Sequence, residues 1–341
     1  IDRIYSFSKE RLPEQATEQA RNYAARLDGQ FQSFAQVARS TAEFLTIQPD
    51  ISERQLYAML SANITQNPLI YGSAIAFEPY QFREDLKLFS PYVYRSGPGM
   101  KSIDIASESY DYSSGEWEWY TRPKEAGQAV WTEPYFDEGA GNILMVTYSV
   151  PFYKNGTFRG IATIDIPLEK LQQQSGIEQL HDQPFLIVSP TGKFVAHPDS
   201  SLIMKATIQE WAEHFKDTAA ETISGKILNG ETGVGILQKA DLMGMPVSGP
   251  VWIFFAPIQS TGWSFVTAVP ESVMTSYVRT QLTRGIIGII VMVSLVTFCI
   301  LMVGTHLTKP IRRLAIAVAQ LGQGNLDTKI GEEIVRLLRQ L

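Results

Sequence analysis

Residues 143–166 read ILMVTYSVPFYKNGTFRGIATIDI, and this stretch decides the fold class. Two runs rich in β-branched and aromatic residues lie on either side of an Asn-Gly pair, Asn155-Gly156. Such a pair between two such runs is typical of a tight turn that joins antiparallel strands. The stretch therefore predicts a β-hairpin, and with it an antiparallel sheet.

Further runs of the same kind lie on both sides of this hairpin. Upstream are LIYGSAIAF (69–77) and SPYVYR (90–95), and downstream PFLIVSPTGKFVAHP (184–198) reads as a second hairpin. GVGILQ, VWIFFAPI and WSFVTAVP supply three more strands between residues 233 and 270, after a polar helical segment at 201–228. We therefore predict an α+β protein with two antiparallel modules in tandem.

A long helix is expected to precede both modules, over residues 1–47. Its apolar residues recur at three- and four-residue spacing: Leu27, Phe31, Phe34, Val37, Ala38, Ala42 and Leu45. Ser52 followed by Gln55 has the pattern of a capping box, which predicts the start of a second helix. After Asp165, the sequence PLEKLQQQSGIEQL predicts a helical linker between the modules.

Residues 285–307 form an uncharged apolar run long enough to cross a bilayer as a helix. Lys309, Arg312 and Arg313 follow the run, against Arg279 and Arg284 before it, which favours a cytoplasmic location for the residues after 307. Residues 1 to about 280 would then be extracytoplasmic. Export of so large a part requires a signal, so we expect a first membrane helix or leader ahead of Ile1.

Beyond the apolar run, residues 308–341 predict a helix, a connector with Gly322 and Gly324, and a second helix. Helices in this arrangement directly after a membrane span are typical of dimeric coiled-coil packing. A homodimer is therefore expected.

Composition excludes several classes of function. The net charge of the 341-residue chain is −6, so a nucleic acid partner is not expected. The single cysteine, Cys299, lies in the apolar run, and the four histidines are scattered without metal-ligand spacing. We predict no metal site and no cofactor. No nucleophile elbow, P-loop or kinase motif is visible, so this segment is not expected to be an enzyme.

Three of these features together resemble the bacterial double-Cache transmembrane sensors. They are the long first helix, the two strand modules, and a membrane helix followed by TKPIRRL and GQGNLD, which look like a HAMP relay. The resemblance implies PAS-like modules in a bacterial inner-membrane receptor. The expected parts are a helix at 1–47, a ligand-binding membrane-distal module at 48–172, a membrane-proximal module at 173–278, a transmembrane helix at 285–307 and a HAMP segment at 308–341.

One subgroup of that family recognises amino acids through a spaced motif in the distal module. This chain matches the motif at Tyr112, Trp119, Tyr120, Tyr135, Asp137 and Asp165. In the family an Arg holds the ligand carboxylate and the two Asp residues hold the ammonium. Trp117 stands at the Arg position here.

The residue types agree with a cation site. Carboxylates and aromatic faces bind an ammonium group best. Asp137 and Asp165 supply the carboxylates, and the rings of Trp119, Tyr120 and Tyr135 supply the faces. Without the Arg the ligand carboxylate has no evident partner, and Trp117 adds another ring that can bind a cation. We therefore expect a small amine or other cation as the ligand, with an amino acid as the alternative.

Two simpler interpretations stay open at this point. The aromatic residues of 115–141 could form a packed hydrophobic corner, and Asp165 could belong to an internal pair, because a buried carboxylate needs partners. Glu116 and Glu118 are expected to face solvent.

The sensor hypothesis predicts that ligand binding biases a cytoplasmic output beyond Leu341. The segment WTEPYFDEGAGNILMVTYSVPFY is similar to sensor regions attached to histidine kinases and to PPM-type serine phosphatases, and chemoreceptor and cyclase outputs are further alternatives. An enzyme within the present residues and a structural adhesion domain are the competing classes.

Overall fold

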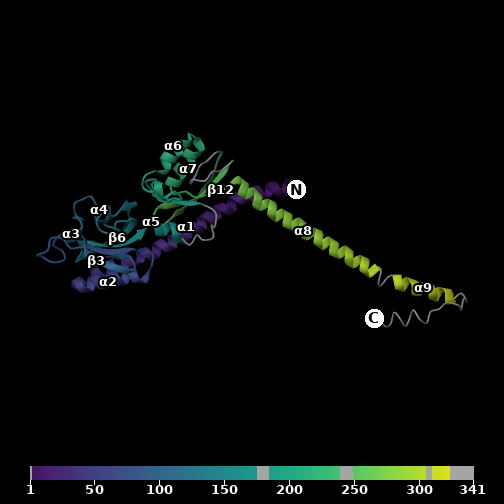
Figure 1. Ribbon diagram of the computed structural model, residues 1–341, viewed down its shortest axis with the longest axis horizontal. Coiled ribbons are helices and arrows are strands. Elements are labelled where there is room, and N and C mark those ends of the chain that lie inside the picture. Colours follow the sequence, from purple (N-terminus) through teal and green to yellow (C-terminus); the bar gives the residue numbers. More distant parts are fainter. Residues whose placement is uncertain (1, 175–183, 239–248, 305–308, 323–341) are drawn as a thin grey trace. The chain divides into compact units, whose positions relative to one another are not determined.

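The computed structural model describes residues 2–174, 184–238, 249–304 and 309–322. Ile1–Met274 form one compact unit and Thr275–Leu341 a second. The first unit holds a long helix and two antiparallel sheets (Figure 1). The predicted α+β class is therefore confirmed.

The first sheet has the strand order β3-β2-β1-β7-β6-β4, and β5 pairs with β6. Its strands are β1 (Gly72–Phe77), β2 (Pro91–Ser96), β3 (Gly99–Asp104), β4 (Val130–Trp131), β5 (Tyr135–Phe136), β6 (Leu144–Lys154) and β7 (Thr157–Pro167). All neighbours are antiparallel. The predicted hairpin is β6–β7, and its turn residues Asn155 and Gly156 have φ of 51° and 79°, as a tight hairpin turn requires.

Four helices accompany this sheet: α2 (Glu53–Gln66), α3 (Ile105–Glu108), α4 (Glu118–Ala126) and α5 (Leu168–Gln174). The start of α2 is the predicted capping box, since the Gln55 side chain accepts a hydrogen bond from the backbone N–H of Ser52 at 3.0 Å. Helix α5 is the first part of the predicted linker, and the remainder lies outside the described residues.

The second sheet has the order β10-β11-β12-β8-β9. Its strands are β8 (Phe185–Val188), β9 (Phe194–Ala196), β10 (Gly233–Leu237), β11 (Val251–Ile258) and β12 (Trp263–Pro270). The segment predicted as polar and helical forms a short 3₁₀ turn, η2 (Ser200–Leu202), followed by α6 (Ile208–Phe215) and α7 (Thr218–Leu228). These two helices bury an apolar face in the second core, which includes Ile208, Ala212, Ala220, Ile223 and Ile227.

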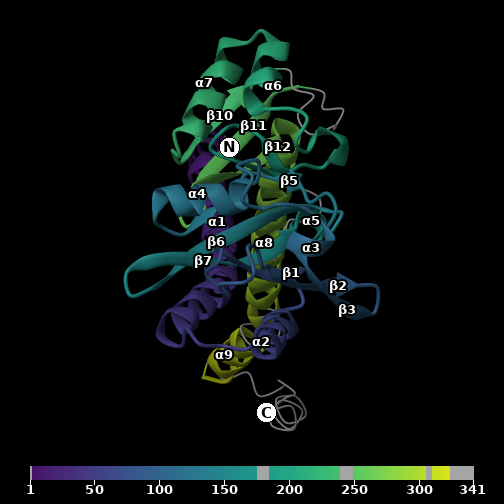
Figure 2. The same cartoon turned by 90° about the vertical axis from the view of Figure 1, so that its left-hand side faces the viewer.

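Helix α1 (Asp2–Ile47) lies along both sheets and contacts β6, β7, β11 and β12 (Figures 1 and 2). Its buried side chains follow the predicted spacing: Ala20, Ala24, Leu27, Phe31, Phe34, Ala38, Ala42 and Leu45. Phe31 contacts Trp131 of the first sheet and Trp263 of the second, with ring centroids 5.2 and 5.0 Å away. One hydrophobic core therefore continues from the first module into the second.

Helix α8 (Glu271–Val303) starts directly after the last strand and contains residues 285–303 of the predicted apolar run, whose last residues, 305–307, lie outside the described residues. Within it, Thr283–Val303 has a mean hydropathy of 3.0 and no buried residues, so it is long and apolar enough to cross a membrane. Helix α9 (Lys309–Gly322) agrees with the first predicted helix of the HAMP segment. The connector and the second helix of that segment lie outside the described residues.

Candidate ligand-binding site

Two buried aspartates line one small cavity in the first module. Asp165 lies on β7, and its Cα pairs with Gly72 on β1 and Thr147 on β6, so it sits in the interior of the sheet. Asp137 follows β5 directly. The two residues are 3% and 1% exposed. Strand pairing thus brings together two carboxylates that are far apart in the sequence.

Asp165 is held by a chain of hydroxyl groups. The Thr147 hydroxyl donates to Oδ1 of Asp165 at 2.8 Å. Because that hydrogen is committed, the 2.7 Å contact between Tyr135 and Thr147 is a hydrogen bond donated by the Tyr135 hydroxyl. The backbone of Thr147 is held in turn by Thr132, which exchanges hydrogen bonds with it through both its backbone and its hydroxyl. Asp165 therefore has a fixed but neutral donor.

Asp137 is also held by neutral donors. The Tyr110 hydroxyl donates to its Oδ1 at 3.1 Å, and the backbone N–H of Gly141 donates to its Oδ2 at 2.6 Å. Within the described residues, no salt bridge involves Asp137 or Asp165. Two carboxylates are thus buried in one site without a compensating cation.

This burial changes the protonation of both groups. Burial, together with the nearby charge of Asp137, raises the pKa of Asp165 to about 7, although the hydroxyl groups of Thr147 and Tyr92 lower it in part. Burial also raises the pKa of Asp137, while the hydrogen bonds from Gly141 and Tyr110 lower it. Near neutral pH, Asp165 can therefore either bind a proton or, when ionised, attract another positive charge.

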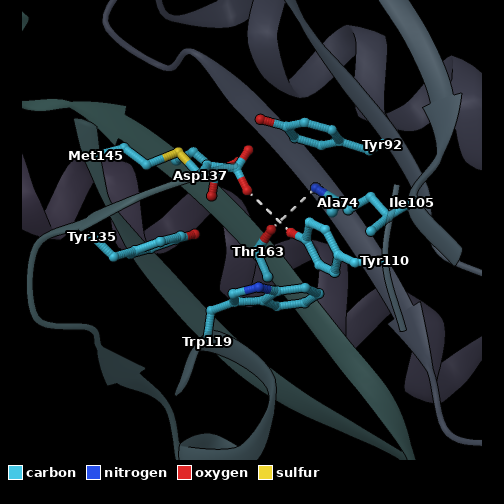
Figure 3. Close-up of a pocket in the computed structure, with 10 residues that line it drawn as sticks. Ala74, Tyr92, Ile105, Tyr110, Trp119, Tyr135, Asp137, Met145 and Thr163 are labelled. Atoms are coloured by element: carbon cyan, nitrogen blue, oxygen red, sulfur yellow. Dashed lines mark hydrogen bonds between the residues drawn. The ribbon is translucent and has the colours of Figure 1, made fainter. Parts of the chain in front are cut away.

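The cavity, called the inner cavity below, is walled by aromatic rings (Figure 3). Its lining is Ala74, Tyr92, Ile105, Tyr110, Trp119, Tyr135, Asp137, Met145, Thr163 and Asp165. None of these is a Lys or Arg. Its free volume of about 10 Å³ has room for about one water molecule. A larger ligand therefore requires the surrounding side chains to move.

Two buried polar atoms in this wall, the Tyr92 hydroxyl and the indole nitrogen of Trp119, form no well-aligned hydrogen bond in the described part of the chain. The Tyr92 hydroxyl is nevertheless close enough to Asp165, and the Trp119 indole close enough to Tyr110, to lower the pKa of that neighbour. Buried polar groups are usually satisfied by protein, water or ligand, so the cavity offers two groups for a bound molecule to engage. The indole N–H can only donate, so its partner must be an acceptor.

The structure brings four of the seven predicted site residues to the inner cavity: Trp119, Tyr135, Asp137 and Asp165. Tyr112 does not line it, because its hydroxyl bonds to the backbone of Phe77 and Phe89 instead. Tyr120 does not line it either. Its hydroxyl donates to Glu78 at 2.5 Å.

Trp117 lies one layer behind the inner cavity. Its ring stacks on Tyr110, with centroids 3.7 Å apart and planes 16° from parallel. Tyr110 in turn contacts Asp137. Trp117, predicted to stand at the position of the family's Arg, therefore does not line the inner cavity and contacts its lining residue Tyr110.

Tyr92, Tyr110 and Thr163 were missed by sequence reasoning. Thr163 could have been predicted from the sequence, because residues two apart on a strand lie on the same face and Thr163 is two residues before Asp165. No local sequence pattern predicts Tyr92, which lines the cavity because β2 pairs with β1 and β1 pairs with β7. Tyr110 comes from an irregular segment after α3.

Replacing Gly72 with alanine should distort this site. A Cβ at residue 72 would lie 2.5 and 2.7 Å from two ring atoms of Tyr92, so the ring would have to leave its place in the wall. We expect a loss of ~1–3 kcal/mol in the free energy of unfolding and weaker ligand binding, measured by denaturation and calorimetry. Gly29→Ala, in an open position on α1, is the matched control and should not destabilise the protein. Unchanged stability in Gly72→Ala would contradict this packing.

The stability of the unliganded protein should depend on pH through Asp165. Its pKa is about 7 in the folded state against 3.8 as a free side chain, so the folded state binds more protons between these values. Stability is therefore expected to fall as the pH rises from about 4 to 7, by up to ~4 kcal/mol, and then to level off. Denaturation at pH 5 and pH 8 measures the fall, which should shrink in Asp165→Asn. Equal pH dependence in both proteins would contradict the assignment.

The comparisons with known proteins agree with this fold. Residues 56–173 match the family model described as methyl-accepting chemotaxis protein-like, first PDC sensor domain. The methyl-accepting chemotaxis protein TlpQ of Pseudomonas aeruginosa is 28% identical over 250 residues, which are 65% of this chain and 32% of TlpQ. The chain spans about a third of the length of the curated relatives it matches.

Solved sensor domains have the same architecture. The extracellular domain of the putative histidine kinase soHK1S-Z6 is 28% identical with a TM-score of 0.66, covering 80% of this chain and 99% of that one. The ligand-binding domain of the Pseudomonas aeruginosa amino acid chemoreceptor PctB, in complex with L-Arg, has a TM-score of 0.55 at 17% identity, over 80% and 94% of the two chains. At that identity the likeness is one of fold.

Fold and site together define the class of this protein: it is a sensor with a long N-terminal helix and PAS-like antiparallel modules. More specifically, the chain carries a PDC, or Cache, sensor domain of the type found in methyl-accepting chemotaxis proteins, at residues 56–173.

Proposed function

We propose that this chain is the sensory part of a bacterial inner-membrane receptor, and that its inner cavity binds a small amine. The observation that carries the proposal is the pair of buried aspartates, which have neutral donors but no cationic partner among the described residues. Transferring a carboxylate out of water is costly unless a charge compensates it. An ammonium group would supply that charge together with three hydrogen-bond donors.

The aromatic wall supports a cation as the ligand. The rings of Tyr92, Tyr110, Trp119 and Tyr135 line the cavity together with the aspartates, and aromatic faces attract ammonium groups electrostatically. Trp117 replaces the Arg that would hold a carboxylate, and no Lys or Arg lines the cavity in its stead. The carboxylate of a zwitterionic ligand would therefore have no Lys or Arg of the lining as its partner.

An amino acid is the second candidate. It is favoured by one observation: the buried indole N–H of Trp119 forms no well-aligned hydrogen bond in the described part of the chain and can donate to an acceptor. A ligand carboxylate could take that hydrogen bond. A single neutral donor is a weaker partner for a carboxylate than a bidentate Arg, so the amine has the stronger support.

The remaining parts of the receptor are proposed from the resemblance and from the helices. The apolar helix Thr283–Val303 would anchor the sensor with the residues before it outside the cytoplasm. A HAMP segment over 308–341 would pass the signal to an output beyond Leu341, in a homodimer. A chemotaxis output accords with the relatives, and a histidine kinase or serine phosphatase output would use the same input.

Calorimetric titration of the chain in nanodiscs tests the ligand class. Methylamine and n-butylamine carry an ammonium group alone, whereas glycine and alanine carry an ammonium group and a carboxylate. The set therefore measures the effect of the ligand carboxylate on binding. Binding of the amines with negligible binding of the amino acids supports the proposal. Tight binding of amino acids without binding of amines would overturn it in favour of the second candidate.

A further inference from the structure

The size of the inner cavity limits what can compensate its two carboxylates in the unliganded protein. Asp137 and Asp165 both line the cavity, and they are 1% and 3% exposed. The free volume of about 10 Å³ has room for about one water molecule and not for a hydrated metal ion. A proton needs no additional volume. One of these carboxylates can therefore be neutralised by protonation without any movement of the cavity walls.

The basic side chains of the strands and helices that line the cavity all bind other groups. They are Arg95 on β2, Lys154 on β6, Arg159 on β7, and Arg122 and Lys124 on α4. The three arginines donate to backbone carbonyl groups, and the two lysines pair with Asp50 and Glu78. Within the described residues, no basic side chain is therefore available to either cavity aspartate.

The other titratable groups that face the aspartates are tyrosines. They are Tyr71 before β1, Tyr92 on β2, Tyr110 after α3 and Tyr135 on β5. Burial raises the pKa of each hydroxyl, that of Tyr71 to about 12, so all four stay neutral in mildly acidic and mildly basic solution. The acidic residues of the neighbouring segment, Glu116 and Glu118, are exposed to solvent as expected. A proton exchanged near neutral pH in this cavity therefore belongs to an aspartate.

Hydrogen bonds distinguish the two aspartates. Asp137 accepts from the Tyr110 hydroxyl and from the backbone N–H of Gly141, and both donors favour its ionised form. Asp165 accepts one well-aligned hydrogen bond, from the Thr147 hydroxyl, and lies in the interior of the sheet between β1 and β6. Its pKa is accordingly raised to about 7. Asp165 is therefore the group that takes up a proton as the solution becomes acidic.

An ammonium group in the cavity would compete with this proton. A positive charge beside Asp165 favours the ionised carboxylate, so the pKa of Asp165 falls in the complex. A ligand that lowers the pKa of a group is itself bound more weakly when that group is protonated, because the coupling is reciprocal. Below a pH of about 7, binding must therefore displace the proton, whereas above it the carboxylate is already ionised.

We propose that a proton and an ammonium group exchange at Asp165, so that acid acts as a competitor of the amine and the receptor responds to amine concentration and acidity together. This rests on the proposed function, because the amine occupies the same cavity. In acid, the free receptor holds a proton on Asp165. The complex holds the ammonium group against the ionised carboxylate, and the displaced proton goes to solvent. An acidic medium therefore weakens the response to a given amine concentration.

Calorimetry of the full chain in nanodiscs tests the exchange with n-butylamine at pH 5, 6, 7 and 8. The alkylammonium group stays charged over this range, as that of Lys does. The affinity should be about 100-fold weaker at pH 5 than at pH 8. Titrations in two buffers with different ionisation enthalpies count the protons. Binding should release about one proton per amine at pH 5 and almost none at pH 8.

Two variants and a second measurement assign the proton. Asp165→Asn should remove both the pH dependence of the affinity and the release of a proton. Asp85→Asn, at an exposed position paired with Arg83, is the matched control and should retain both. Infrared spectra of the unliganded protein at pH 6 should contain the C=O stretching band of a protonated buried carboxyl. We expect n-butylamine to remove this band, and Asp165→Asn to lack it.

The outcomes separate the exchange from the proposed function. If n-butylamine binds at no pH, the proposed function fails and the exchange fails with it. If n-butylamine binds equally at pH 5 and pH 8 without proton release, the ligand class stands and the exchange is overturned. A pH dependence or an infrared band that persists in Asp165→Asn also overturns it. Thermal unfolding at each pH excludes acid unfolding as the cause, since the free protein should be more stable at pH 5 than at pH 8.

Discussion

Asp165→Asn should lower the affinity for cationic amines by about 100-fold and raise the stability of the unliganded protein at pH 8. The carboxylate is buried beside Asp137, and no cation of the described residues pairs with it, so its charge is unfavourable in the free protein and would be a direct partner of the ligand in the proposed complex. Asparagine retains the oxygen that accepts the hydrogen bond from Thr147, so the local structure has a donor and an acceptor as before. Calorimetry measures the first effect and thermal unfolding the second.

The opposite signs of these two effects distinguish a ligand site from a structural pair. A carboxylate that stabilised the fold through an internal cation would lose stability on becoming neutral. Asp85→Asn is the control, because its side chain is 79% exposed and its pairing with Arg83 is on the surface. A fall in the unfolding midpoint of Asp165→Asn at pH 8, with amine affinity retained, would refute the assignment.

Trp263→Ala should cost ~3–5 kcal/mol in the free energy of unfolding and should uncouple the two sheets. Trp263 is 2% exposed and contacts both Phe31 of α1 and Trp131 of β4, with ring centroids 5.0 and 5.9 Å away. Trp263 also begins β12, the strand that leads directly into α8. Denaturation monitors the stability, and hydrogen exchange of β12 with and without amine monitors the coupling.

The contact between the two tryptophans can be isolated by comparison. Trp263→Phe keeps a ring at the position and should retain most of the stability. A double-mutant cycle of Trp131→Ala and Trp263→Ala should give a coupling energy of about 0.5–1.5 kcal/mol. Trp252→Ala, at a partly buried position on β11 outside this trio, serves as the control. Strict additivity in the cycle would show that the sheets do not communicate through these rings.

Hydrogen bonds connect the ligand site to the contact between Trp131 and Trp263. Asp165 accepts from the Thr147 hydroxyl, and the backbone of Thr147 accepts from the N–H of Thr132 and donates to its hydroxyl; Thr132 is the neighbour of Trp131. A ligand that draws Asp165 toward its ammonium group would thus pull on the strand that carries Trp131. Such a ligand can bias the receptor only through a difference in affinity between its two states.

Local patterns were sufficient for most of the secondary structure. The Asn-Gly turn, the Ser52–Gln55 capping box and the spacing of apolar residues along α1 each depend on residues a few positions apart. The predicted strands and helices in the described ranges agree with the structure for this reason. The polar appearance of 201–228 was misleading, because a helix needs only one apolar stripe to join a core.

Patterns in the sequence predicted the site residues less completely than the secondary structure. The spaced motif pointed to Asp137 and Asp165, and both line the inner cavity. Tyr112 and Tyr120 share that motif, yet their hydroxyls are bound to Phe77, Phe89 and Glu78, away from the lining. Spacing along the chain does not decide which way a side chain in an irregular segment turns.

The sequence by itself determined the α+β class, the order of the two modules, the apolar helix and the presence of two carboxylates among aromatic residues. The tertiary structure alone decided that no cation among the described residues pairs with those carboxylates, and that Trp117 stacks on Tyr110 instead of lining the inner cavity. The physical reason is the range of the interactions. Turns, caps and amphipathic faces depend on neighbours in the chain, whereas desolvation and charge compensation depend on every group that the folded strands bring within a few ångströms.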